Sequence, residues 1–263
     1  VVMGNCGVGF APARPDQHDW LIQLMEGVED IPGSALAEGI NWDWETFPEY
    51  LDALEKFDRS IDIGTQIPHG AVRAYVMGER SDQVATPDDI EKMSLIVEEA
   101  LGAGALGFTS SRTMLHRAKD GEPVPGTFAG HDELMSLGRA CGRAGHGVFE
   151  ISSDFGLGGM HGRFREDVDW MSALSKETGL PISFILAQAS HHPDEWREIL
   201  RWTEQAVSAG ANLRAQVAAR PAGMLMNFDN PMHPFKGHPT YLGVAALSLE
   251  DKVKALSVPM TRK

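Results

Sequence analysis

The sequence predicts an α/β fold, a partial (β/α)8 barrel of TIM type, and two observations support this prediction. Short apolar runs typical of buried strands alternate with longer stretches in which apolar residues recur at helical spacing. Alternation of this kind predicts crossover units on a parallel sheet. After the first interval, the strand-like runs begin roughly 30 to 45 residues apart, which leaves room for one helix and its loops in each unit.

The expected strands are short and mostly apolar. They cover residues 1–6, 60–69, 105–109, 147–152, 181–188 and 212–218. A complete eight-unit barrel with insertions needs more chain than these 263 residues supply, so we assign the runs to about strands two to seven of a catalytic barrel. A doubly wound open sheet is the structural alternative, but no Gly-x-Gly-x-x-Gly follows the first run to support it.

The segments between these runs carry helix signals. Thr86 is suited to cap a helix, Pro87 to fill its first turn, and Asp88 to lie at the positive end of the helix dipole. Gly102 is suited to end this helix. Further helices are expected at 131–144, 166–178 and 193–210.

Residues 11–58 are too long for a simple loop between the first two runs. We expect them to form a cap-like insertion near the mouth of the barrel. It carries the aromatic residues Trp20, Trp42, Trp44, Phe47 and Tyr50. The aromatic-rich residues 41–47 either line a substrate pocket or belong to a long loop that packs on itself, and the sequence leaves both alternatives open.

Composition argues against several classes of function. Hydrophobic residues make up 43% of the chain and charged residues 23%, as in soluble globular enzymes. The net charge of −14 argues against nucleic acid or an anionic membrane as a partner, because both attract clustered Lys and Arg. No run of 18 apolar residues and no signal peptide is visible, so we expect a cytoplasmic enzyme that acts on a small molecule.

The chain has two cysteines, Cys6 and Cys141, too few for a disulfide framework. One bridge between them is possible, but reduced thiols are the simpler interpretation. Cys141 has helical neighbours and is expected in the core. Because there is no initiator Met and Val1 already resembles the inside of a strand, we expect a fragment of a longer protein.

Candidate site residues follow from barrel geometry, in which reacting groups lie at the carboxyl ends of the strands. The residues at or just beyond these ends are Cys6, His69, Ser110, Ser111, Arg112, Glu150, Asp154, Gln188, His191, His192 and Arg220. The predicted metal ligands and most of the predicted substrate-binding residues belong to this set.

Three residues are predicted metal ligands: Cys6, Glu150 and His191. Gly4 and Gly7 let the backbone turn tightly around Cys6, and a thiolate is a strong zinc ligand, although a lone cysteine is more often a small buried hydrophobe. Glu150 lies in an apolar run where an unpaired carboxylate is costly, so a metal or a buried Arg is expected beside it. His191 precedes a helix start and is either a ligand or part of a helix cap.

The predicted substrate-binding residues are His69, Arg73, Arg112, His116, Gln188 and Arg220. His69 lies at a strand end, and Arg73, four residues later, is suited to bind a carboxylate. Arg112 and His116 belong to the polar loop 110–128 and are suited to hold a substrate carboxylate, because Arg binds it through two parallel hydrogen bonds. Solvated loop charges are the alternative for both.

Several segments resemble the D-aminoacylase branch of the amidohydrolase superfamily, the N-acyl-D-amino-acid deacylases. They cover 2–12, 27–32, 44–51, 69–73, 104–110 and 220–223, in order along nearly the whole chain. The resemblance implies a barrel that binds one or two zinc ions and hydrolyses the amide of an N-acyl-D-amino acid. The metal would polarise the carbonyl and lower the pKa of a bound water.

In this family a His-x-His pair on the first strand and an Asp on the last strand complete the site. Neither falls within these residues, so the general base is unassigned and the chain by itself is expected to be inactive. The family also places a metal-binding His on the strands matching 147–153 and 181–188, where this chain has Glu150 and Gln188 instead. Glu150 is therefore a hypothetical replacement ligand.

Two other functions stay open at this point. One is a cyclic-amide hydrolase of the dihydropyrimidinase type. The other is a metal-free barrel that binds a small molecule without hydrolysing it, which the departures at the expected ligands keep open.

Overall fold

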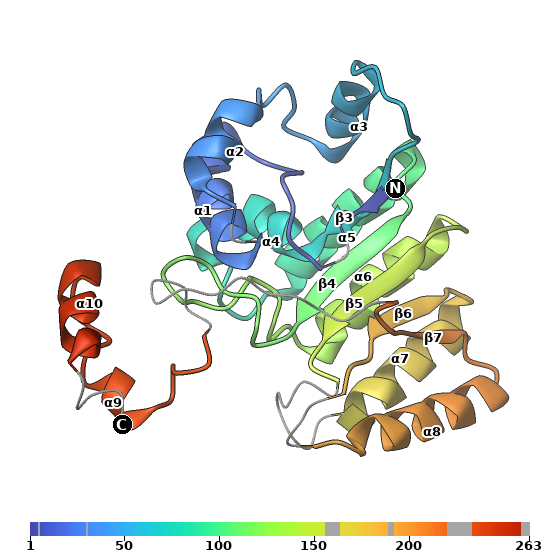
Figure 1. Cartoon of the computed structure of the whole chain (residues 1–263). Helices are drawn as coiled ribbons and strands as arrows, with labels where there is room; N and C mark the ends of the chain where they lie inside the picture. Colours follow the sequence, from blue (N-terminus) through green and yellow to red (C-terminus); the bar gives the residue numbers. More distant parts are fainter. Residues whose placement is uncertain (5, 30, 156–163, 189–191, 220–232, 259–263) are drawn as a thin grey trace. The chain divides into compact units, whose positions relative to one another are not determined.

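The structure is a computed structural model that describes the chain except at residues 5, 30, 156–163, 189–191, 220–232 and 259–263. The chain divides into two compact units, Val1–Val217 and Ala218–Lys263. The first unit carries the sheet and the helices that cover it (Figure 1). The second carries the helices α9 (Pro239–Leu242) and α10 (Leu249–Ser257).

The strands of the first unit are parallel and pair in the order of the sequence. The short strand β1 (Val2–Met3) pairs with β2 (Gly64–Thr65). The main sheet has the order β3 (Ile67–Pro68), β4 (Gly107–Arg112), β5 (Val148–Ser153), β6 (Ile182–Ile185) and β7 (Leu213–Gln216). In a doubly wound sheet the strand order reverses at one point. The order here does not reverse, and it fits one wall of a (β/α)8 barrel.

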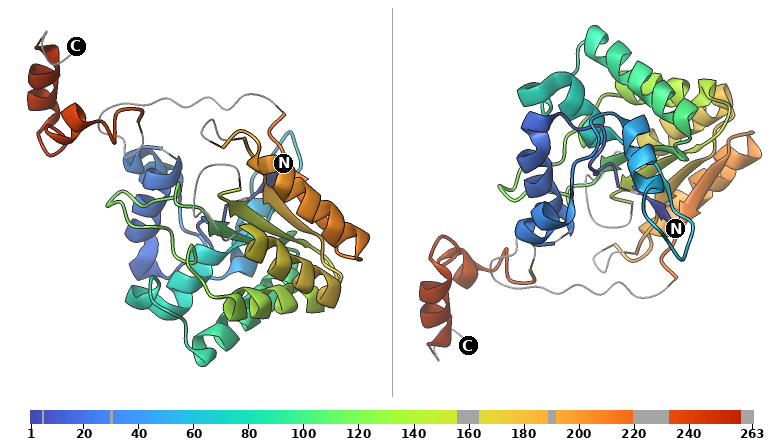
Figure 2. Two further views of the ribbon diagram at one scale, coloured as in Figure 1. Left: turned by 90° about the horizontal axis from the view of Figure 1, so that it is seen from below. Right: turned by 90° about the horizontal axis from the view of Figure 1, so that it is seen from above.

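Helices follow the strands and cover one face of the sheet. They are α4 (His69–Met77), α5 (Pro87–Ala103), α6 (His131–Arg143), α7 (Phe164–Thr178) and α8 (Glu195–Ser208). Figure 2 shows α5 to α8, coloured from teal to orange, following one another around the outside of the sheet. A ring of helices outside a parallel sheet is the arrangement expected of a barrel wall.

The start of α5 follows its local sequence signals. Thr86 Oγ1 accepts a hydrogen bond from Asp89 N at 3.2 Å, and the Asp89 carboxylate accepts one from Thr86 N at 3.0 Å. Pro87 fills the first turn, as predicted. The helix ends two residues later than expected, at Gly104 instead of Gly102, where a φ of 116° favours glycine.

The expected strand 60–69 is shorter in the structure. Only β2 and β3 are extended, and His69 is the first residue of α4. Pro68 has no backbone N–H to donate to a neighbouring strand, which is consistent with the sheet pairing ending there.

The insertion contains three helices, α1 (His18–Glu29), α2 (Gly33–Gly39) and α3 (Phe47–Glu55). Its aromatic rings contact one another. Trp42 stacks on His18 with ring centroids 3.8 Å apart, and Trp44 Nε1 donates a hydrogen bond to Phe10 O at 2.8 Å. These contacts correspond to self-packing, one of the two alternatives, and a role as a cap over the site stays a prediction.

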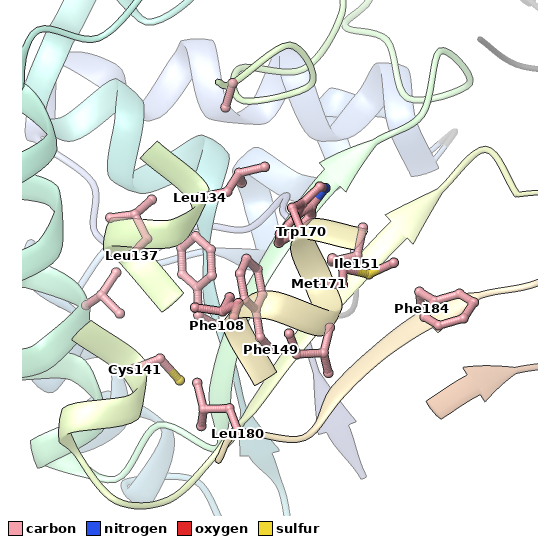
Figure 3. Close-up of a cluster of buried hydrophobic side chains, with 14 of the residues drawn as sticks. Phe108, Leu134, Leu137, Cys141, Phe149, Ile151, Trp170, Met171, Leu180 and Phe184 are labelled. Atoms are coloured by element: carbon pink, nitrogen blue, oxygen red, sulfur yellow. The ribbon is translucent and has the colours of Figure 1, made fainter. Parts of the chain in front are cut away.

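The hydrophobic core lies between the sheet and the helices that cover it (Figure 3). Phe108 of β4 and Phe149 of β5 are fully buried there, with ring centroids 5.0 Å apart. Leu137 and Cys141 of α6 pack in the same cluster, so the predicted core position of Cys141 is confirmed.

Successive side chains of a strand point to opposite faces, and β4 shows both. Phe108 and Ser110 point toward the helices. Thr109 and Ser111 point to the opposite side, which we call the inner face. The strand register places a row of polar residues side by side across this face: Thr109, Glu150, Ser183 and Arg214.

Among the described residues, no helix is long and apolar enough to cross a membrane.

Candidate functional site

The Cys6–Gly7 turn lies against β4. Gly7 N donates a hydrogen bond to Thr109 Oγ1 at 3.1 Å, and Gly7 O accepts one from Gly70 N at 2.9 Å. A Cβ at position 7 would lie 2.5 Å from Ser111 N, and the φ of 75° also favours glycine. Only glycine therefore lets this turn approach the strand so closely.

Cys6 is half-buried in a small cluster between α1 and the loop that follows β4. Its Sγ lies 3.9 Å from Glu29 Oε1. Burial raises the pKa of the Cys6 thiol to about 11, and the nearby charges of Glu29 and Glu150 contribute in the same direction. The thiol is therefore neutral near pH 7 unless a cation lies beside it.

Glu150 lies on the inner face of β5 and accepts a hydrogen bond from Gln66 Nε2 at 2.6 Å. The carboxylate thus pairs with an amide, whereas the sequence led us to expect a metal or a buried Arg. A cavity of about 490 Å³ borders it, with Gln66, Glu150, Ser183 and Arg214 among the lining residues. Within the described part of the chain, Gln66 Oε1 and Ser183 Oγ are buried without a hydrogen-bond partner.

The described residues supply only part of a metal site. Among them, no group of three or more His, Cys, Asp or Glu side chains is arranged to hold a metal ion. Cys6 and Glu150 are near enough for their charges to interact, but Glu150 is engaged by Gln66. The third predicted ligand, His191, lies outside the described residues. We therefore assign no catalytic step to a metal in this part of the site.

His69 and Arg73 belong to a buried network on the helix side of the sheet. His69 Nδ1 lies 2.9 Å from Ser110 Oγ, and His69 Nε2 lies 2.8 Å from Glu133 Oε1. Arg73 donates hydrogen bonds to Glu133 and to the Ser81 and Gln83 carbonyls. Every side-chain nitrogen of His69 and Arg73 is thus bonded to another group of the protein. For this reason we do not retain the two residues as substrate-binding residues.

The pKa values of His69 and Glu133 are both lowered, but for different reasons. Burial lowers the pKa of His69, and the hydrogen bond to Glu133 only partly offsets it. Burial acts to raise the pKa of Glu133, but the bonds from His69 and Arg73 outweigh it and lower the value. The network is consistent with a structural link between α4, β4 and α6.

Arg112 is also turned toward the helices. Its Nη1 donates to Ala129 O at 3.1 Å, and its Nε lies 3.2 Å from Asp167 Oδ1 of α7. The guanidinium that was predicted to bind a substrate carboxylate is therefore paired with a carboxylate of the protein. Sequence reasoning missed both Glu133 and Asp167, because their partners come from distant parts of the chain.

His116 lies over the inner face, at the carboxyl end of β4. Its Nδ1 is 2.8 Å from Ser111 Oγ. Asp154, just beyond β5, accepts hydrogen bonds from Thr113 Oγ1 and, at 3.2 Å, from Met114 N. Burial lowers the pKa of His116, and the charge of Asp154 opposes this. Ser111 and Asp154, which the strand-end rule predicted, thus lie at this end of the sheet together with His116 of the polar loop.

The remaining predicted substrate-binding residues lie in loops. Gln188 is exposed, and its Nε2 donates to Pro193 O at 3.0 Å. Arg220 lies outside the described residues.

The fold is one wall of a parallel α/β barrel with polar residues at its strand ends, and the family comparison fits this architecture. A model described as "Amidohydrolase family" matches residues 1–258, so the chain belongs to this family. The predicted partial (β/α)8 barrel is thereby confirmed.

The proteins and solved structures that resemble this chain include D-aminoacylases and a related deacylase. The D-aminoacylase of Alcaligenes xylosoxydans xylosoxydans is 32% identical over 110 residues, which are 42% of this chain and 20% of that protein. Among solved structures, the zinc- and inhibitor-bound N-acyl-D-glutamate deacylase of Bordetella bronchiseptica superposes with a TM-score of 0.62 at 20% identity, covering 84% of this chain and 41% of that one. A D-aminoacylase structure described by its binuclear metal centre gives 0.60 at 22% identity, covering 82% and 40%.

The matched region therefore spans about a fifth of the length of the curated D-aminoacylase and less than half of the solved chains. The solved structures support the fold. The family match supports hydrolysis of a C–N bond as the class of reaction.

Proposed function

We propose that this chain is part of a zinc-dependent amidohydrolase that cleaves the amide of an N-acyl-D-amino acid or a similar small substrate. The observation that supports it most is the family match over residues 1–258 together with the Cys6 turn held at the strand ends. Sequence similarity to a D-aminoacylase favours this substrate class over a cyclic amide. We also propose a cytoplasmic location and a small-molecule partner.

One or two zinc ions are the proposed cofactor. Cys6 and Glu150 are the described residues that we propose as ligands, and His191 is a further proposed ligand. When bound, zinc would polarise the substrate carbonyl and activate a water. The negative charges of Glu29 and Glu150, which act on Cys6, favour a cation beside its sulfur.

Substrate binding is proposed for His116, Gln188 and Arg220. His116 is the one of these that the structure describes beside the polar strand ends. The chain by itself is expected to be inactive, because the remaining ligands and the base are expected outside it.

The proposal is tested on the full-length protein that contains this chain. Zinc content is measured by elemental analysis, and hydrolysis is measured on a panel of N-acyl-D-amino acids, their L-enantiomers and cyclic amides. We expect bound zinc and a preference for the D-substrates. Activity confined to cyclic amides would favour a dihydropyrimidinase-type enzyme, and absence of zinc and activity would favour a binding barrel.

The Glu150→Gln variant tests the replacement ligand. We expect it to lower the zinc content of the full-length protein, with Glu99→Gln on the exposed face of α5 as the matched control. Unchanged zinc in Glu150→Gln would remove Glu150 from the ligand set.

A further inference from the structure

Asp154 is a buried carboxylate just beyond β5, and the proposed function gives it no role. The residue is 5% exposed. Among the described residues, its hydrogen-bond partners are a hydroxyl and a backbone N–H, and none is a Lys or Arg side chain. Burying an ionised carboxylate without a cation is costly, so we expect a specific role for Asp154.

Both carboxylate oxygens of Asp154 bind the start of the loop after β4. Thr113 Oγ1 donates a hydrogen bond to Oδ1, and Met114 N donates one to Oδ2 at 3.2 Å. The Thr113 hydroxyl in turn accepts a hydrogen bond from Leu115 N at 3.1 Å. One side chain thus fixes residues 113–115 to the end of the neighbouring strand.

The next part of this loop, residues 114–124, is a small hairpin that we call the His116 hairpin. Val124 N donates a hydrogen bond to His116 O at 3.3 Å, and Ala118 N donates one to Glu122 O at 2.8 Å. The Arg117 guanidinium donates to two carbonyls of the same hairpin. Because these bonds lie within the hairpin, an anchor at its start fixes the position of the whole unit.

The helix α1 holds the opposite side of the His116 hairpin. A Cβ at Gly27 would lie 2.5 Å from the backbone of Ala118, so helix and hairpin are in close contact. Lys119 Nζ also lies 2.9 Å from Glu26 Oε1. The hairpin is therefore held between α1 and the end of β5, and Asp154 supplies the contact on the β5 side.

His116 lies at the base of this hairpin, three residues after Thr113. Its Nδ1 is 2.8 Å from Ser111 Oγ of β4, on the inner face of the sheet. The contact requires the base of the hairpin to stay close to the strand. The hydrogen bonds of Asp154 meet this requirement, because they join the residues between Ser111 and His116 to β5.

We propose that Asp154 is a positioning residue, which fixes the His116 hairpin to the end of β5 and so holds His116 where it binds the substrate. This inference rests on the proposed function, in which His116 is a substrate-binding residue. Loss of a residue of this kind weakens substrate binding and leaves the chemical step largely unchanged, so KM rises while kcat does not fall in proportion.

The variant Asp154→Asn separates the hydrogen bonds of Asp154 from its charge. An Asn amide can donate to the Thr113 hydroxyl and accept from Met114 N, whereas Asp154→Ala loses both bonds. In the full-length protein we expect Asp154→Ala to raise KM about 10-fold with kcat within about threefold of the parent, and Asp154→Asn to keep KM within about threefold. The matched control is Asp120→Ala, an exposed carboxylate of the same hairpin, which should leave KM unchanged.

The charge of Asp154 also acts on His116, which gives a rival route for its effect. If Asp154→Asn raises KM as much as Asp154→Ala does, the charge accounts for the effect and the inference is wrong. Thr113→Val and Thr113→Ser repeat the comparison from the other side of the hydrogen bond. Only Thr113→Val, which lacks the hydroxyl, should raise KM, and this pair decides the matter if Asp154→Ala does not fold.

A double variant tests whether Asp154 acts through His116. In a His116→Ala background, Asp154→Ala should produce no further rise in KM, because the side chain that it positions is already absent. If the two increases in KM multiply instead, Asp154 contributes to binding independently of His116, and the inference fails.

The anchor is also measured without an activity assay, by limited digestion of the folded full-length protein with trypsin. Mass spectrometry follows cleavage after Arg117 and Lys119, the two trypsin sites of the His116 hairpin. We expect Asp154→Ala to speed this cleavage severalfold and Asp154→Asn to leave it unchanged. Unchanged cleavage in Asp154→Ala would contradict the anchor.

Faster cleavage with an unchanged KM would show that the anchor is only structural, so the inference would fail while the proposed function stands. If the parent cleaves no substrate on the panel, the proposed function fails and the inference fails with it.

Discussion

Cys6 shows how neighbours decide the chemistry of a residue. Its sulfur is half-buried and lies near two carboxylates, and these surroundings raise the pKa of its thiol to about 11. A free thiol has a pKa nearer 9, so the folded chain favours the uncharged form. The same carboxylates would help to bind a divalent cation, whose charge would reverse this preference.

The pH dependence of alkylation tests this environment. At pH 8 a thiol with a pKa of about 11 is about one part in a thousand thiolate, so metal-free Cys6 should react with iodoacetamide roughly 100-fold more slowly than an ordinary cysteine. The rate should keep rising up to about pH 11. Glu29→Gln should speed the reaction at pH 8, because it removes a charge that raises the pKa.

The measurement uses a Cys141→Ala background, so that Cys6 is the only thiol of the chain. The matched control is Glu122→Gln, an exposed carboxylate of the loop after β4. A rate like that of free cysteine at pH 8 would contradict the raised pKa.

The sequence predicts which polar residues lie near the strand ends. It does not predict to which face of the sheet each side chain points. The sequence predicted a substrate-binding role for His69, Arg112 and His116 alike, the first two from the strand-end rule and the third from the polar loop 110–128. The structure turns His69 and Arg112 to the helix side and His116 to the inner face, because side chains alternate along β4 and because distant carboxylates pair with the first two. A one-residue shift in register would exchange these faces.

At the scale of elements, the Cys6–Gly7 turn depends on close contact with β4. The contact leaves no room for a side chain at position 7, since a Cβ would meet the Ser111 backbone. The backbone bonds from Gly7 to Thr109 and Gly70 hold the turn in place. The location of Cys6 is thus set by the residue that follows it.

Gly7→Ala should be more destabilising than the left-handed backbone alone explains. Gly121 has a similar positive φ of 89° but no atoms within 4 Å of the place where a Cβ would lie, so Gly121→Ala isolates the conformational cost, about 1–2 kcal/mol. We expect Gly7→Ala to cost about 1–3 kcal/mol more than this control because of the clash. Urea unfolding of both variants of the full-length protein measures the difference, and equal costs would contradict the close approach.

Most helices and strands could be predicted, because their signals are local. The capping residues of α5 and the apolar face of each helix lie within a few residues of one another in the sequence. The errors fall at ends, such as the run 60–69, where Pro68 and the start of α4 shorten the strand. The aromatic packing of the insertion also needed the structure, since Phe10 and His18, which contact Trp42, are more than 20 residues away from it in the sequence.

At the scale of the whole molecule, β7 has only β6 as a neighbour in the sheet among the described residues. Val217, directly after β7, is 71% exposed, and Ile185 of β6 is 37% exposed. A sheet edge with exposed apolar residues favours association between copies of a chain.

We therefore expect these 263 residues, expressed by themselves, to aggregate, and Val217→Lys to raise the soluble fraction severalfold. Lysine at a sheet edge opposes pairing with another strand. Leu95→Lys is the matched control, because Leu95 is 61% exposed but lies on α5, away from the strand edge. Centrifugation and light scattering compare the two, and equal gains from both variants would point to general surface hydrophobicity instead.

The sequence by itself determined the parallel α/β class, the order of the units, the family resemblance and the pool of polar residues at the strand ends. These depend on periodicity and on neighbours along the chain, which a linear sequence displays directly. Only the tertiary structure decided which of those residues are engaged in the helix-side networks and which face the inner side. That division depends on strand register and on partners far away in the sequence, such as Glu133 for His69, 64 residues apart, and no local pattern encodes it.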